Sequence, residues 1–101
     1  MLFDEVKMYS QINEELKSLV IQNMAKNLAV LRAMLHLSQA QLASLIGVSR
    51  QTIVLFETEK RTMPWSTYIA LLFIFDNNSI TKPLLSVMGI YPDELREFFT
   101  L

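Results

Sequence analysis

The sequence predicts an all-α protein, folded as one compact domain of five to six helices over residues 1–101. Apolar residues recur at spacings of three and four, which is typical of helices, and strand-like alternation is missing. The chain has only two glycines and three prolines, and they fall between the periodic segments. At 51% hydrophobic residues, the chain can bury a core without metal or disulfides.

Composition excludes several classes of protein. The absence of cysteine excludes a disulfide framework and a cysteine-ligated metal site, and the single histidine, His36, cannot build a metal cluster. The longest apolar run, Ile69 to Phe75, is far shorter than the roughly 20 residues that span a bilayer. The first residues lack the basic start and small-residue cleavage site of a signal peptide. We therefore expect a cytoplasmic protein with no membrane segment, metal or cofactor.

The first long helix is expected from Ser10, which can act as its N-cap, to about Leu35. The preceding segment, Leu2 to Tyr9, is short and ambiguous. His36 tolerates the left-handed conformation that ends a helix better than most residues do. One apolar stripe runs along this helix and comprises Leu16, Leu19, Val20, Met24, Leu28, Leu31 and Leu35.

Two short helices are expected next, over residues 39–46 and 50–58. Ser38 and Gln41 have the spacing of a capping box, which marks the start of the first of them. Gly47 is a natural left-handed stop for that helix, and Ser49 is the N-cap of the second.

A loop over residues 59–63 leads to a third helix, expected over residues 65–75. Pro64 fits the start of that helix, because proline is accepted in the first turn. The segment is apolar nearly all round, as expected for the central helix of a bundle. Residues 76–79 form a cluster of turn-forming side chains.

The chain is expected to end in two further helices. The first covers about residues 80–88, with Pro83 in its first turn and Gly89 as its stop. The last begins at Pro92, and the two acidic residues that follow favour its N-terminal dipole.

The most informative pattern lies in residues 37–57, LSQAQLASLIGVSRQTIVLFE. The small side chain of Ala43 allows two helices to cross closely, and Gly47 makes the turn between them. Five apolar residues form the wedge that fixes the crossing angle: Leu42, Ile46, Val48, Ile53 and Phe56. Residues 39–57 are therefore expected to form a helix-turn-helix, whose DNA-binding version lays its second helix in the major groove.

The motif resembles the Cro/C1-type helix-turn-helix of the Xre family of phage and bacterial transcriptional regulators. The resemblance rests on the Ser-Gln start, Ala43, Gly47, the Ser-Arg-Gln-Thr entry at residues 49–52 and the closing Glu57. It covers about residues 32–75, between an N-terminal extension (1–31) and a C-terminal extension (76–101). It implies a lambda-repressor-like DNA-binding fold with extra N- and C-terminal helices, and an ion pair between Arg32 and Glu57.

The sequence departs from the family pattern in two places. Val54 and Leu55 are apolar where many relatives carry polar, base-reading side chains. They can contact thymine methyl groups or face a protein. Glu59 stands where the family usually has glycine, and the loop before Pro64 is one residue longer.

A helical wheel places Arg50 and Gln51 at the exposed start of the second motif helix, with Glu57 facing inward. Arginine pairs with guanine and glutamine with adenine in the major groove. Lys60 and Arg61 follow that helix, where phosphates are the expected targets. Residues 32–65 are the only segment with more basic than acidic side chains, four against two. The residues expected to contact DNA are Gln39, Ser49, Arg50, Gln51, Thr52, Leu55, Lys60 and Arg61.

These observations predict sequence-specific binding of double-stranded DNA by a transcriptional repressor, with helix 50–58 in the major groove. The high apolar content favours a homodimer, formed through residues 91–101 or, as a second choice, residues 1–20. An alternative is an antitoxin or adaptor whose extra helices bind a partner protein and whose DNA binding is secondary. Catalysis is not expected, because the chain has no thiol nucleophile and no glycine-rich phosphate loop.

Overall fold

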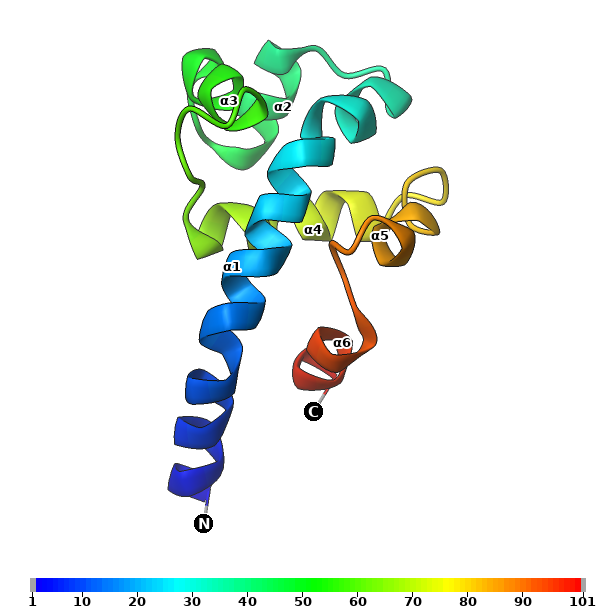
Figure 1. The fold of residues 1–101 in the computed structure, drawn as a ribbon. Coiled ribbons are helices and arrows are strands. Elements are labelled where there is room, and N and C mark those ends of the chain that lie inside the picture. Colours follow the sequence, from blue (N-terminus) through cyan, green and yellow to red (C-terminus); the bar gives the residue numbers. More distant parts are fainter. Residues whose placement is uncertain (1, 101) are drawn as a thin grey trace.

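The computed structural model describes residues 2–100, with side chains from residue 14 onward. The described residues form six helices and no strand, which confirms the expected all-α bundle (Figure 1). The helices are α1 (Leu2–Met34), α2 (Gln39–Ile46), α3 (Arg50–Glu57), α4 (Trp65–Asp76), α5 (Leu84–Val87) and α6 (Asp93–Phe99).

Helix α1 is longer than the sequence suggested. It runs without a break from Leu2 to Met34, so the expected start at Ser10 is wrong. No glycine or proline interrupts the helix, and an interior serine costs only a fraction of a kcal/mol in helix propensity. Its first turns project beyond the other helices (Figure 1). At its other end His36 has φ 57, which confirms the left-handed stop.

The core lies where α1 contacts α3 and α4. Five members of the expected α1 stripe are buried: Leu16, Val20, Met24, Leu28 and Leu31. Leu35 is half-buried and packs against them. Leu19 was wrongly included, because its side chain is 52% exposed. At about 100° per residue it falls on the flank of the stripe formed by the other members.

Helix α4 crosses α1 at the middle of the molecule (Figure 1). It buries Tyr68, Leu71, Leu72 and Phe75, as a central helix should. It is not enclosed on all sides, however, because the side chain of Phe73 is 70% exposed. The all-round apolar character of this helix therefore includes a solvent-facing aromatic residue.

The segment after α4 is less helical than expected. The predicted helix over residues 80–88 is reduced to the four residues of α5, and residues 79–83 form turns. Pro83 occupies the N-cap position and disfavours helical geometry in the residue before it. The hydroxyl of the buried Thr81 donates a hydrogen bond to the Phe75 carbonyl at 2.7 Å and holds the turn against α4. The start of α6 after Pro92 is confirmed.

Two hydrogen bonds to backbone carbonyls attach the C-terminal segment to the core. The Tyr68 hydroxyl donates to the Ile90 carbonyl at 2.6 Å. The Asn23 amide donates to the carbonyl of Gly89 at 2.9 Å. Burial raises the pKa of Tyr68, and the neighbouring Tyr91 raises it further. The phenol therefore stays protonated as a hydrogen-bond donor.

Candidate nucleic-acid interface

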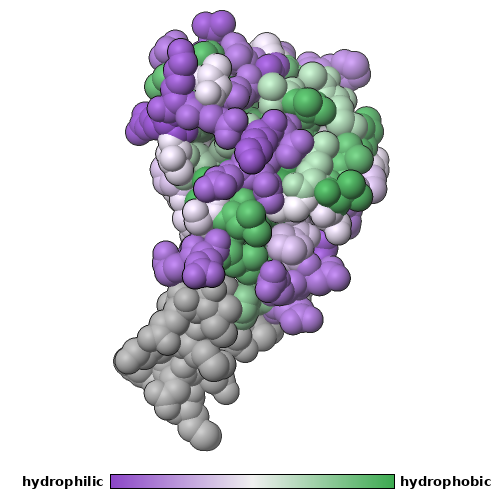
Figure 2. Space-filling model, viewed as in Figure 1, coloured by the Kyte–Doolittle hydropathy of each residue, from purple (hydrophilic) through white to green (hydrophobic). Residues whose placement is uncertain are grey.

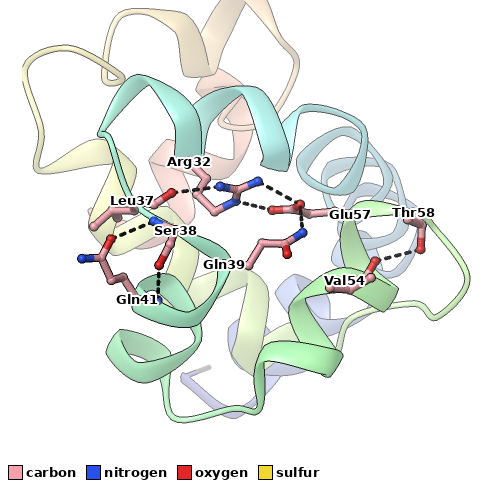
Figure 3. Close-up of polar contacts among 8 residues, drawn as sticks. All are labelled: Arg32, Leu37, Ser38, Gln39, Gln41, Val54, Glu57 and Thr58. Atoms are coloured by element: carbon pink, nitrogen blue, oxygen red, sulfur yellow. Dashed lines mark hydrogen bonds and ion pairs between the residues drawn. The ribbon is translucent and has the colours of Figure 1, made fainter.

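The first motif helix, α2, begins with the expected capping box (Figure 3). The Gln41 backbone N–H donates to Ser38 Oγ at 3.0 Å, and the Ser38 N–H donates to Gln41 Oε1 at 2.8 Å. The helix ends at Gly47, whose φ of 77 confirms the left-handed turn. Ser49 then caps α3 by accepting a hydrogen bond from the Thr52 N–H at 3.1 Å.

The crossing of α2 and α3 is set by the apolar wedge that the spacing predicted. Leu42, Ile53 and Phe56 are buried, and Ile46 and Val48 are half-buried against them. Ala43 is 2% exposed, which confirms the expected small contact residue. The wedge fixes which side of α3 faces outward.

An ion pair joins α1 to α3, as the family resemblance implied. The Arg32 guanidinium contacts the Glu57 carboxylate through two hydrogen bonds, of 2.6 Å from Nε and 3.2 Å from Nη2. The two side chains are 18% and 6% exposed. Arg32 Nη1 also donates to the Leu37 carbonyl at 2.9 Å. The arginine therefore also holds the segment that leads into α2.

Gln39 adds a third helix to this network. Its amide Nε2 donates to Glu57 Oε1 at 3.0 Å, so side chains from α1, α2 and α3 meet at one carboxylate (Figure 3). The motif predicted only a DNA contact for Gln39, and its bond to Glu57 was not foreseen. The inward position of Glu57 was the available signal, because a buried carboxylate requires several donors.

The outward side of α3 carries the residues expected to read bases. Arg50 and Gln51 are exposed, and neither side chain makes a hydrogen bond or ion pair within the described residues. Leu55 and Val54 are half-buried, so each presents part of an apolar side chain on the same helix. The Thr52 hydroxyl forms a hydrogen bond with Ser49 Oγ at 2.8 Å.

The loop after α3 presents two basic side chains, those of Lys60 and Arg61, and both are exposed. Their backbone N–H groups donate to the Leu55 carbonyl at 3.0 and 3.3 Å, which ties the loop to α3. The Arg61 guanidinium lies 6.0 Å from the centroid of the Phe56 ring. The loop thus places positive charge directly beside the end of α3.

Glu59 has φ 57, in the left-handed region. This explains why the family pattern has glycine at this position, since glycine adopts that conformation without strain. Here a glutamate adopts the left-handed conformation, and its exposed carboxylate directly precedes the basic residues Lys60 and Arg61. Because Arg32 neutralises Glu57, the exposed charged residues of segment 38–62 are three basic and one acidic. Polar side chains cover this end of the molecule, over α2 and α3 (Figure 2).

Comparison with known families agrees with this geometry. Residues 28–64 match the family model described as helix-turn-helix. This places the motif in the class of DNA-binding helix-turn-helix units. Specifically, it is of the Cro/C1 type, and the all-helical fold around it is lambda-repressor-like, as the sequence predicted. No curated protein and no solved structure gives a significant match to the chain.

The match runs from residue 28 to Pro64, so residues 2–27 of α1 and all of α4, α5 and α6 lie outside it. Within the described residues, no helix combines the length and the apolar character that crossing a membrane requires.

Proposed function

We propose that the protein is a sequence-specific repressor that binds double-stranded DNA, with α3 in the major groove. The observation that carries the proposal is the pair Arg50 and Gln51, exposed and unpaired at the N-terminal end of a helix whose other side is locked in place. A helix with only a structural role needs no such pair. Residues at this end of a recognition helix are the ones that reach base edges.

The surrounding residues support this docking. Two N–H groups of the Arg50 guanidinium can donate to guanine O6 and N7, and the Gln51 amide can pair with adenine. Leu55 and the methyl group of Thr52 can contact thymine methyl groups. Lys60 and Arg61 are placed for phosphates.

Ser49 and Gln39 lie at the N-termini of α3 and α2, where backbone amides favour an anion. One hydrogen of the Gln39 amide is already bound to Glu57. Its remaining amide hydrogen is left for a phosphate oxygen.

The proposed active form is a homodimer in the cytoplasm. One copy offers a single recognition helix, and a single module buries little DNA surface. Two copies related by a two-fold axis place two helices about one DNA turn apart on a palindromic site. Residues outside the motif supply the contact in this proposal, because the motif itself faces DNA.

A second candidate function is that of an antitoxin or adaptor that binds a partner protein. It is favoured by the exposed apolar side chains outside the motif, such as Phe73 (70% exposed) and Val87 (84% exposed). Large apolar side chains on a surface often mark a protein interface. In this case DNA binding is secondary.

A gel shift on the DNA upstream of the protein's own gene tests the proposed function. We expect the wild type to shift this DNA, and the double variant Arg50→Ala/Gln51→Ala to lose the specific complex while staying folded. The matched control is Lys82→Ala, which removes an exposed basic residue in the turn before α5, and α5 lies across the view from α3 in Figure 1. Equal binding by all three proteins, or a wild type that binds no DNA in a selection from a random pool, would favour the partner-binding function.

A further inference from the structure

An aromatic face lies outside the helix-turn-helix, between α4 and α6. Phe73 of α4 is 70% exposed, and Phe99 of α6 is 44% exposed. Next to Phe73 the surface is hollowed into a cleft of about 170 Å³, which we call the α4–α6 cleft. Ile69, Leu72 and Tyr91 line its apolar part together with the two phenylalanines.

The α4–α6 cleft has the size of an aromatic side chain. An apolar cavity of about 150 Å³ is large enough to hold a benzene ring. The same face therefore carries a protruding phenylalanine and a hollow that can receive one. A contact between two identical copies requires a surface that is complementary to itself, and a projection beside a matching hollow provides this.

Two charged side chains, Asp76 and Arg96, lie near the cleft, and no ion pair joins them within the described residues. Asp76, at the edge of the cleft, has a buried Oδ1 atom with no hydrogen-bond partner within the described residues. A buried carboxylate oxygen without a donor is costly. The Arg96 guanidinium lies 4.1 Å from the centroid of the Tyr91 ring and forms no ion pair within the described residues.

The Tyr91 phenol lies within reach of both charges. Burial raises the pKa of Tyr91, Arg96 lowers it and Asp76 raises it. The face thus presents one acid that lines the hollow and one base that stacks on a residue of its lining.

We propose that the α4–α6 cleft is the homodimer interface of this protein, with Phe73 of each copy inserted in the cleft of the other and Arg96 of one copy paired with Asp76 of the other. The occupant is a second copy because one face holds both the projection and the hollow, and both members of the charge pair. The inference rests on the proposed function in one respect, which is that a palindromic site requires a dimer.

A second apolar region supplies the control. Val87 on α5 is 84% exposed, and Ile80 in the preceding turn is 55% exposed. Apolar side chains gather around α5 on the right-hand side of the molecule in Figure 2. Neither residue lines the α4–α6 cleft. A substitution of Val87 therefore removes exposed apolar surface without touching the proposed interface.

Sedimentation velocity of the full chain without DNA tests the proposal. We expect a wild-type dimer at micromolar concentration and a dimer dissociation constant raised at least about tenfold by Phe73→Ser, as expected for loss of a buried aromatic anchor. Val87→Ser should leave the constant unchanged. Arg96→Glu should weaken the dimer less, by apposing two acids, and high salt should reduce the difference from wild type. Because Phe73 and Val87 are exposed, both serine variants should keep the helical circular dichroism of the wild type. Val87→Ser should also keep its melting temperature, whereas Phe73→Ser should lose the part of the melting temperature that rises with protein concentration.

A wild type that stays monomeric, or a Phe73→Ser variant that dimerises as tightly as wild type, would overturn the interface. Loss of the dimer in Val87→Ser alone would assign it to the α5 side. Binding to selected DNA is measured separately on the same proteins. A wild type that binds DNA while Phe73→Ser stays dimeric refutes the interface only. A wild type that dimerises through Phe73 and binds no DNA refutes the proposed function only.

Discussion

The motif half (residues 28–64) and the C-terminal segment (residues 65–100) are held in place by different kinds of hydrogen bond. In the motif half, the hydrogen bonds that join one helix to another run between side chains, as those of Arg32 and Gln39 do at the carboxylate of Glu57, while bonds to the backbone there are local. In the C-terminal segment, side chains bind backbone carbonyls, as the Tyr68 hydroxyl does at Ile90. A sequence shows which charged or polar side chain needs a partner. It does not show which backbone carbonyl will accept a hydrogen bond, because every residue has one. This difference separates what the sequence predicts well from what it predicts poorly.

The largest expected effect is on the motif half. Arg32→Ala leaves the carboxylate of Glu57, with only 6% of its side chain exposed, without its cation. We expect a loss of about 3 kcal/mol in the free energy of unfolding, measured by urea denaturation followed by circular dichroism. Arg32→Lys, which keeps the charge but not the paired hydrogen bonds, should lose less. A loss below about 1 kcal/mol for the alanine variant would mean that side-chain pairing does not hold this half together.

Alanine substitutions at the two left-handed glycines allow the stability of the two halves to be compared directly. At Gly47 (φ 77) an added Cβ meets nothing within 4 Å, whereas at Gly89 (φ 70) it lies 2.7 Å from Asn23 Nδ2. Gly47→Ala should cost about 1 kcal/mol, from backbone strain alone. Gly89→Ala should cost about 2 kcal/mol, because the same strain is joined by displacement of the Asn23 hydrogen bond.

The Asn23→Ala background isolates the second contribution, since it removes the atom that the new methyl group meets. In that background Gly89→Ala should cost no more than Gly47→Ala does in the wild type. Thermal unfolding of the variants gives the comparison. Equal losses for the two single glycine variants would show that the carbonyl bond of Gly89 does not hold the C-terminal segment.

The smallest effect is expected at Glu59, where the chain departs from the family pattern. Glu59→Gly should raise the free energy of unfolding by about 0.5–1 kcal/mol, because it relieves a left-handed residue with φ 57. Glu59→Gln keeps the strain and removes the acid, so it should strengthen DNA binding without raising stability. If the glycine and glutamine variants are equally stable, the strain at this position is negligible.

Local patterns in the motif half were sufficient for prediction. The capping box of Ser38 and Gln41, the left-handed Gly47 and the inward Glu57 all follow from spacing, because each involves residues within a few positions of one another. The partner of Glu57 came from the family resemblance, because 25 residues separate it from Arg32. The contact of Gln39 with the same carboxylate was missed because those two residues are also far apart in the sequence, by 18 positions.

Outside the motif, the sequence predicted element types better than their extents. The start of α1 was misplaced because Ser10 is equally compatible with an N-cap and with a helix interior. The turn at residues 79–83 depends on the buried Thr81 hydroxyl, which binds a carbonyl on α4. The exposure of Phe73 depends on where α6 lies, and no local pattern specifies that position.

The central claim is that Arg50 and Gln51 of α3 read bases, and selection of bound DNA from a random pool tests it most directly. The selection is run on the wild type and on three variants: Arg50→Ala, Gln51→Ala and Lys60→Ala. We predict that Arg50→Ala and Gln51→Ala each relax the preference at one position of the site, since a bidentate base contact is worth about 1–3 kcal/mol of discrimination. Lys60→Ala should return the wild-type site with uniformly weaker binding and a salt slope lower by about one. If all three variants return the wild-type site, Arg50 and Gln51 do not read bases, and the proposed role of α3 is wrong.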